Sequence, residues 1–301
     1  MKLDEMNAFM ALVQLQSTRE TAELLGLTQP AITRRVQSLE ASLGVVLLDR
    51  QTKPLTLTPI GLRVYQQCQR ISNEMGVLRQ LVAQDEPPSG VLRLGMPQSI
   101  TDIGVLPALK TLTRRFPHIE PHLSGNWGNS LLQGMQKGAL DAALLLLPAS
   151  NVFPHGWQCH DLGPVPLVVI AAGDDKPVPD TLAACHQRGW VLNPEGCGFR
   201  AGLERALKDR GLPMRINMEV TGSNLQLALI AAGNGLGLLP RYLVESSVYA
   251  NRLRILPLRD FQPHNRLWLA HATLPRPLAD AAACFGAAVA AGLGLAEPVA
   301  Q

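Results

Sequence analysis

One stretch near the N-terminus, residues 28–40 (TQPAITRRVQSLE), constrains the fold more than any other part of the chain. Thr28 can cap a helix by accepting from first-turn amides, and Pro30 is tolerated in that turn because its missing N–H would have no partner there. Four apolar residues then recur at helical spacing, namely Ile32, Val36, Leu39 and Leu43. The pattern predicts an amphipathic helix that begins sharply at Thr28.

The opposite face of this predicted helix is polar and almost free of acids. It carries Gln29, Thr33, Arg34 and Gln37. Arginine can pair bidentately with guanine and glutamine with adenine, so this face suits a DNA major groove. An ordinary helical hairpin with a solvated outer face is the alternative interpretation.

The residues before this helix predict a second, shorter one. Ser17 and Glu20 have the spacing of a capping box, and Gly26-Leu27 gives a tight turn into Thr28. Two short helices joined by a glycine turn, the second of which carries base-reading side chains, are typical of a helix-turn-helix.

Residues 45–57 contain two short β-prone runs around a basic, proline-bearing tip, which predicts a hairpin wing. Arg50 and Lys53 in this tip are placed to contact backbone phosphates. Although the whole chain has a net charge of only +3, residues 28–70 hold six Lys and Arg against two Asp and Glu. Such a local basic excess is expected where a protein contacts DNA.

A long amphipathic helix is predicted from Pro59 to about Gln84. Its apolar residues follow a spacing of three and four: Ile60, Val64, Cys68, Ile71, Met75, Leu78 and Val82. This heptad-like stripe is typical of a helix that pairs with another helix, which a second chain could supply. The alternative is that the stripe packs against its own domain. Residues 85–90 (DEPPSG) should end the helix and form a hinge between domains.

From Val91 onward, strands alternate with helices, which predicts an α/β sheet. Strands are expected at 91–96, 120–124, 142–147, 167–171, 190–192, 215–220, 237–239, 253–256 and 266–271, with a final helix at about 278–291. The strictly apolar run at 142–147 suits a buried parallel strand.

Residues 1–65 resemble the N-terminal domain of the LysR-type transcriptional regulators. The matching pieces fall in the family's order and spacing: 22–25, 28–34, 39–40, 43–44, 47–50 and 57–61. Thr33 stands where the family usually has serine, and Leu48 where it usually has phenylalanine, a volume-tolerant change. Weaker resemblance to the family's effector domain extends over the rest of the chain, at 134–141, 233–237 and 239–240.

The resemblance implies an α/β protein with an N-terminal all-α winged helix-turn-helix and an effector domain of two Rossmann-like lobes, similar to a periplasmic binding protein. The expected domains are 1–58 for DNA binding, 59–89 for a dimerisation helix and hinge, and 90–301 for effector binding, with lobe I at about 90–164 and 268–301 and lobe II at about 165–267. The expected DNA-binding residues are Thr28, Gln29, Pro30, Thr33, Arg34, Gln37, Arg50 and Lys53.

Ligands of open α/β sheets bind at the carboxyl ends of strands, near helix N-termini. Four predicted loops fit this description and supply the candidate effector-binding residues: Ser99, Ile100, Thr101, Trp127, Asn129, Ser130, Asn193, Phe199, Arg200, Ser223 and Asn224. Hydroxyls, amides and two aromatic rings, with Arg200 as the only nearby cation, would suit a small organic acid. Each of these residues could instead merely cap its helix.

No serine-hydrolase, nucleotide-binding or paired-carboxylate motif is present, so the sequence predicts a regulator rather than an enzyme, with no cofactor and no metal. Five scattered cysteines and the lack of a signal-peptide pattern predict a reduced, cytoplasmic protein without a membrane partner. The expected partners are double-stranded DNA, a small-molecule effector, further copies of the chain in a dimer or tetramer, and, by resemblance, RNA polymerase. The rival class is a small-molecule-binding or enzymatic α/β protein whose N-terminal helices mediate only protein contacts.

Overall fold

The structure is a computed structural model that describes residues 1–49, 55–82, 88–101, 105–175 and 179–295. The chain forms two compact units, an N-terminal unit of residues 1–85 with 137–139 and a C-terminal unit of residues 86–136 with 140–301. No helix in the described ranges is long and apolar enough to cross a membrane.

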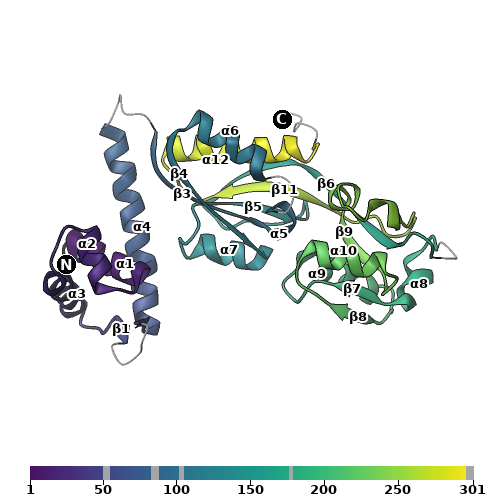
Figure 1. The fold of residues 1–301 in the computed structure, drawn as a ribbon, viewed down its shortest axis with the longest axis horizontal. Coiled ribbons are helices and arrows are strands. Elements are labelled where there is room, and N and C mark those ends of the chain that lie inside the picture. The colour runs from purple at the N-terminus through teal and green to yellow at the C-terminus, as the bar shows by residue number, and fades with distance from the viewer. Residues whose placement is uncertain (50–54, 83–87, 102–104, 176–178, 296–301) are drawn as a thin grey trace. The chain divides into compact units, whose positions relative to one another are not determined.

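The N-terminal unit begins with three helices, α1 (Leu3–Leu15), α2 (Thr18–Leu24) and α3 (Gln29–Leu43) (Figure 1). Both predicted caps are confirmed, because the Ser17 hydroxyl accepts from the Glu20 amide at 3.2 Å and the Thr28 hydroxyl accepts from the Ala31 amide at 3.4 Å. Gly26 makes the turn between α2 and α3 at a φ of 62°, a conformation that glycine adopts without strain.

The apolar stripe of α3 forms the centre of this unit. Ile32, Val36 and Leu39 are buried together with Phe9 of α1. The fourth predicted member, Leu43, is instead 38% exposed, because it lies in the last turn of α3, just before the helix ends at Gly44.

The predicted wing is confirmed as the antiparallel pair β1 (Leu48–Asp49) and β2 (Thr56–Leu57). Glu40 of α3 anchors it by accepting from the Leu47 amide at 2.8 Å. The wing tip, with the predicted phosphate contacts Arg50 and Lys53, lies outside the described residues.

The long helix α4 spans Pro59–Val82. Thr58 caps its N-terminus, because the Thr58 hydroxyl accepts from the Gly61 amide at 2.9 Å. The first part of its predicted stripe does not need a second chain, because Val64, Cys68 and Ile71 pack against the core of the N-terminal unit. Further along, Leu78 is 59% exposed. The intramolecular interpretation therefore holds for Val64, Cys68 and Ile71 and not for Leu78, and Ile60 at the start of the stripe is 37% exposed.

Lobe I of the C-terminal unit is a sheet in the order β6-β11-β5-β3-β4 (Figure 1). Its strands are β3 (Ser89–Pro97), β4 (His118–Asn126), β5 (Ala142–Leu147), β6 (Gln158–Ala172) and β11 (His264–His271). Strand β3 runs parallel to β4 and β5, whereas β11 runs antiparallel to β5 and β6. Ser89 and Gly90, which the sequence assigns to the hinge, are the first residues of β3.

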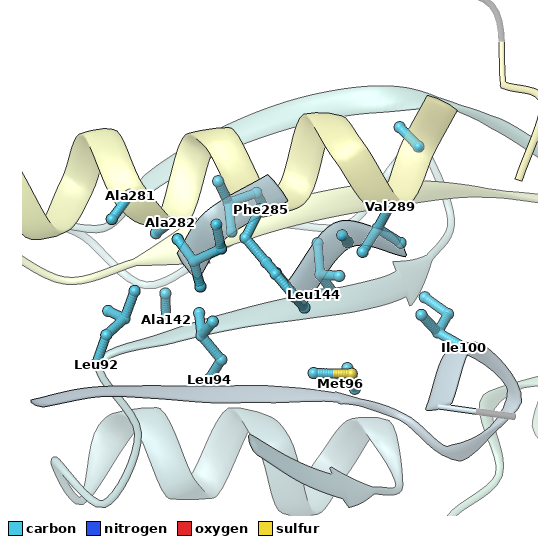
Figure 2. Packing of buried hydrophobic residues seen from close by; sticks show 14 of the residues in the cluster. Leu92, Leu94, Met96, Ile100, Ala142, Leu144, Ala281, Ala282, Phe285 and Val289 are labelled. Atoms are coloured by element: carbon cyan, nitrogen blue, oxygen red, sulfur yellow. The ribbon is translucent and has the colours of Figure 1, made fainter. Parts of the chain in front are cut away.

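Helices cover both faces of this sheet. On one face lie α6 (Val105–Arg115) and α12 (Arg276–Gly292), and Figure 2 shows Phe285 and Val289 of α12 packed over Leu94 of β3 and Leu144 of β5. On the other face lies α7 (Gly128–Gln136). A Cβ at Gly95 would lie 2.5 Å from a methyl group of Leu140 and 2.7 Å from one of Leu131, so a side chain there would displace both leucines.

Lobe II is built on the far half of β6. There β6 pairs with β9 (Gly237–Pro240) and β10 (Leu253–Ile255), while β7 (Trp190–Leu192) and β8 (Ile216–Glu219) form a parallel pair. The remaining helices are α5 (Gln98–Thr101) in lobe I and, in lobe II, α8 (Leu182–Cys185), η1 (His186–Arg188), α9 (Gly198–Lys208), α10 (Ser223–Ala231), α11 (Arg241–Glu245) and η2 (Ala250–Arg252).

The sheet and helix pattern confirms the predicted fold class, although several elements differ from the prediction. Strand β6 begins at Gln158 rather than at residue 167, and it includes Pro164 and Pro166. Residues 158–166 pair only with β11 among the described strands, and such a free edge tolerates the missing N–H of proline. Three short helices, α5, α11 and η2, are also not predicted from the sequence.

Candidate DNA-binding face and inter-lobe cavity

The predicted reading residues of α3 lie together on its exposed face. With Thr18 of α2, they line one shallow groove: Gln29, Pro30, Thr33, Arg34 and Gln37. The Thr28 hydroxyl is instead engaged as the helix cap. The sequence analysis does not predict Thr18 at this face, although its position as the first residue of α2 could have indicated it.

The cations of α3 differ in what they contact. Arg35 pairs with Asp4 of α1 at 3.6 Å and so helps to hold α3 on α1. Arg34 has no ion pair with any described residue, and its side chain is exposed in the groove. The Thr33 hydroxyl donates to the Gln29 carbonyl at 3.1 Å, within the helix. The groove therefore presents two glutamine amides and a guanidinium that has no ion pair in the described part of the chain.

A cavity of about 180 Å³ lies between the two lobes of the C-terminal unit. Six of the predicted effector-binding residues line it: Ser99, Trp127 and Asn129 from lobe I, and Asn193, Phe199 and Ser223 from lobe II. Its apolar wall consists of Pro97, Leu146, Leu147, Leu239, Pro240 and Leu243. The apolar part of a ligand could therefore contact apolar side chains of both lobes.

Three helices of eight or more residues begin at this cavity: α7, α9 and α10. The glycines at their starts, Gly128, Gly198 and Gly222, all line it. A Cβ at Gly128 or at Gly222 would meet no heavy atom within 4 Å, so a ligand can approach the backbone closely there. First-turn amides have no partner within their helix and carry the positive end of its dipole, which favours an anionic group.

Two buried polar atoms of cavity-lining residues lack a hydrogen-bond partner among the described residues. They are the Ser99 hydroxyl oxygen in lobe I and the Asn193 Oδ1 in lobe II. Buried polar atoms are nearly always paired in native proteins, so two exceptions at one cavity point to a missing partner.

The other five predicted effector residues do not line the cavity. Ile100 is fully buried in the core of lobe I, and the Thr101 hydroxyl donates to the Pro97 carbonyl at 3.2 Å. Ser130 and Asn224 each follow a lining residue along a helix but lie outside the lining set.

Arg200, the expected cation, is the most informative of the five. Its guanidinium donates to Glu204 at 2.9 Å, to Glu219 at 2.6 Å and to the Asn193 carbonyl at 3.3 Å. Hydrogen bonds to Glu204 and Glu219 raise the pKa of Arg200. This side chain therefore fastens α9 to β8, and no Asp, Glu, Lys, Arg or His is among the described residues that line the cavity.

Two lining residues that the prediction lacks are Gln226 and Cys197. Gln226 lies one helical turn after Ser223, a spacing that could have indicated it. Burial raises the pKa of the Cys197 thiol, and all five cysteines of the chain are free. Cys197 is thus a protonated lining group rather than a reactive thiolate.

Comparison with known families identifies both parts of the chain. Residues 3–62 match the family described as "Bacterial regulatory helix-turn-helix protein, lysR family", and residues 85–296 match the "LysR substrate binding domain". These two matches show a DNA-binding transcription regulator with an effector-binding domain. The chain belongs to the LysR family.

Individual relatives are similar to this chain over most of its length. The chain is 27% identical to the RuBisCO operon transcriptional regulator of Allochromatium vinosum, over 94% of this chain and 93% of that protein. It is 26% identical to the HTH-type transcriptional regulator CzcR of Bacillus cereus, over 81% and 82% respectively. Among solved structures, a full-length OxyR variant from Pseudomonas aeruginosa matches over 100% of this chain and 99% of its own, with a TM-score of 0.78 and 23% identity.

Proposed function

We propose that this LysR-type regulator binds a small organic acid in the inter-lobe cavity, and that the acid controls the DNA complex made by α3. The observation that carries this proposal is the convergence of three helix N-termini and the unpaired Ser99 hydroxyl on a cavity without charged lining side chains. A carboxylate there would accept from helix amides and hydroxyls and would need no buried lysine or arginine. The apolar wall, with Trp127 and Phe199, would hold the rest of the acid.

Ser99→Ala and Ser223→Ala are each expected to weaken effector binding about tenfold or more, because each removes a hydroxyl that would donate to a charged group. The affinity for DNA without effector should remain unchanged. Thermal-shift screening of the full chain against small carboxylic acids identifies a ligand, because a ligand that binds the native state raises its melting temperature. Calorimetry with that acid then measures the two variants.

Ser130→Ala is the matched control, since Ser130 lies in α7 next to Asn129 but does not line the cavity. This variant should bind the acid like the unaltered protein. If all three serine variants bound it with unchanged affinity, the acid would bind elsewhere.

We also propose that Arg34 reads a guanine from the exposed face of α3. Arg34→Ala should lose about 1–3 kcal/mol of discrimination at one base pair. Arg34→Lys should lose the same discrimination while keeping its charge, because lysine cannot reproduce the bidentate pairing. Fluorescence anisotropy with the DNA upstream of the gene and with single-base variants of it measures both effects.

Arg35→Ala is the control for this experiment, because Arg35 is paired with Asp4 rather than presented in the groove. It should leave the base preference unchanged. Retention of that preference by Arg34→Lys would mean that residue 34 contacts a phosphate instead of a base.

We further propose that the exposed part of α4 joins two chains, as the family resemblance implies, in a dimer or tetramer that contacts RNA polymerase. Leu78→Asp places a charge at a position that is 59% exposed in one chain and would be buried between two. Sedimentation should show dissociation of this variant. Leu62→Asp alters an exposed leucine of the same helix outside the stripe and should leave the assembly intact. An unchanged assembly for Leu78→Asp would contradict pairing through α4.

A further inference from the structure

A short chain of amide hydrogen bonds leads from the core of lobe II to the cavity. The side-chain nitrogen of Gln226 donates to the Val191 carbonyl at 2.8 Å. The side-chain nitrogen of Asn193 in turn donates to the Gln226 Oε1 at 3.1 Å. Gln226 is 1% exposed and Val191 is fully buried, so water does not compete for the inner end of this chain.

The Val191 carbonyl fixes the direction of both amides. A carbonyl can only accept, so Gln226 must present its NH₂ to Val191 and its oxygen to Asn193. That oxygen can only accept as well, so Asn193 must present its NH₂ to Gln226. The Asn193 Oδ1 is therefore turned away from this chain, and it is the atom that lacks a partner. If the Asn193 amide were flipped, its Oδ1 would face the Gln226 Oε1, and neither oxygen can donate a hydrogen bond.

The other polar groups at the cavity are backbone amides, which donate, and side chains that can both donate and accept, namely Gln98, Ser99, Asn129 and Ser223. The first-turn amides of α7, α9 and α10 can only donate, and the Asn126 Oδ1 is already engaged by the Trp127 amide at 2.9 Å. An acid with acceptors alone would satisfy the amides and leave the Asn193 Oδ1 unpaired. A buried acceptor without a partner weakens a complex, so this atom discriminates between ligands.

We propose that the effector carries a hydrogen-bond donor, a hydroxyl or an N–H, in addition to its carboxylate, and that Asn193 Oδ1 accepts from this donor. The inference rests on the inter-lobe effector site proposed above and narrows its ligand to hydroxy- or amino-substituted acids. Asn193 is then the residue that sets specificity, and Gln226 is the positioning residue that holds its amide in one orientation.

The test compares acids in matched sets on the full chain by calorimetry and thermal shift. The probes are glycolate, lactate and the ortho-, meta- and para-hydroxybenzoates, each beside its O-methyl ether and its deoxy acid. The ether keeps the oxygen but removes the donor, and the deoxy acid excludes a purely steric effect of the methyl group. In at least one set, the hydroxy acid should bind about tenfold or more tightly than both analogues, since only it pairs the Asn193 Oδ1.

Asn193→Leu keeps the branched shape and removes the amide, and it should bind the hydroxy acid and the deoxy acid of that set equally. Ser130→Ala alters a residue of α7 that does not line the cavity, and it should keep the preference for the hydroxy acid. The comparison of acids on the unaltered protein also stands without either variant, should Asn193→Leu fail to fold.

The outcomes separate this inference from the proposed function. Equal binding of hydroxy acids and their analogues to the unaltered protein, together with weakening by Ser223→Ala, would overturn the donor requirement and support the cavity. Preference for the hydroxy acid that survives Asn193→Leu would assign the donor to another acceptor and overturn the role of Asn193. A panel in which no acid raises the melting temperature would overturn both proposals.

Discussion

Gly61→Ala is expected to destabilise the N-terminal unit by about 3 kcal/mol or more, at or beyond the upper end of the usual cost of overpacking a core. A Cβ at position 61 would lie 1.9 Å from the carbonyl oxygen of Leu47. That oxygen belongs to backbone held on one side by Glu40, which accepts from the Leu47 amide, and on the other by Thr58, whose amide donates to the Leu47 carbonyl at 3.0 Å. Neither the start of α4 nor the wing can move away without breaking these bonds.

Gly76→Ala provides a control of opposite sign on the same helix. Apart from the backbone of α4 itself, no heavy atom of the described residues lies within 4 Å of a Cβ built at Gly76, so alanine there should stabilise α4 by about 1 kcal/mol through its higher helix propensity. Urea unfolding of both variants, with circular dichroism as the probe, measures the two changes. A Gly61→Ala protein as stable as the unaltered chain would show that α4 does not pack against Leu47 in this way.

Asp141→Ala is expected to destabilise the C-terminal unit by about 3–5 kcal/mol, the usual cost of removing one partner of a buried ion pair. The Asp141 carboxylate accepts from the Arg93 guanidinium at 2.7 Å and 3.0 Å and from the Arg93 amide at 2.8 Å. The Asp141 side chain is 4% exposed and that of Arg93 is 21% exposed, so loss of the carboxylate would leave a largely buried guanidinium next to the start of β5.

Asp280→Ala is the matched control, because Asp280 pairs with Arg276 at 4.0 Å on the exposed surface of α12. A surface pair of this kind contributes at most about 1 kcal/mol, so the variant should unfold at nearly the same denaturant concentration as the unaltered chain. Similar losses for the two aspartates would mean that burial of the Arg93 pair contributes little. A double-mutant cycle with Arg93→Ala isolates the coupling between the two side chains.

The sequence by itself determines the local structure of the N-terminal unit. The caps at Ser17 and Thr28, the turn at Gly26 and the polar face of α3 each depend on residues within a few positions of one another. Such signals act through backbone amides of the same turn, so they predict the helix without knowledge of the rest of the fold. The loops that reach the cavity are predictable for a related reason, since the ends of parallel strands meet at one edge of a sheet.

Which side chains serve the cavity is decided only by the tertiary structure. Arg200 is predicted from its loop as the cation for an acid, but Glu219 on β8 and Glu204 one turn along α9 take up its guanidinium. The spacing from Ser223 can place Gln226 at the cavity, but no local signal indicates its hydrogen bonds, because its partners Val191 and Asn193 lie on and just after β7.

The same distinction explains the stripe of α4. Its spacing determines that one face is apolar, but a spacing does not state what covers that face. Packing assigns Val64, Cys68 and Ile71 to the core of their own unit and leaves Leu78 exposed. Local hydrogen bonds can thus be predicted from neighbouring residues. The partners of a residue in packing and in ion pairs cannot, because they lie far apart in the sequence and only the folded chain brings them together.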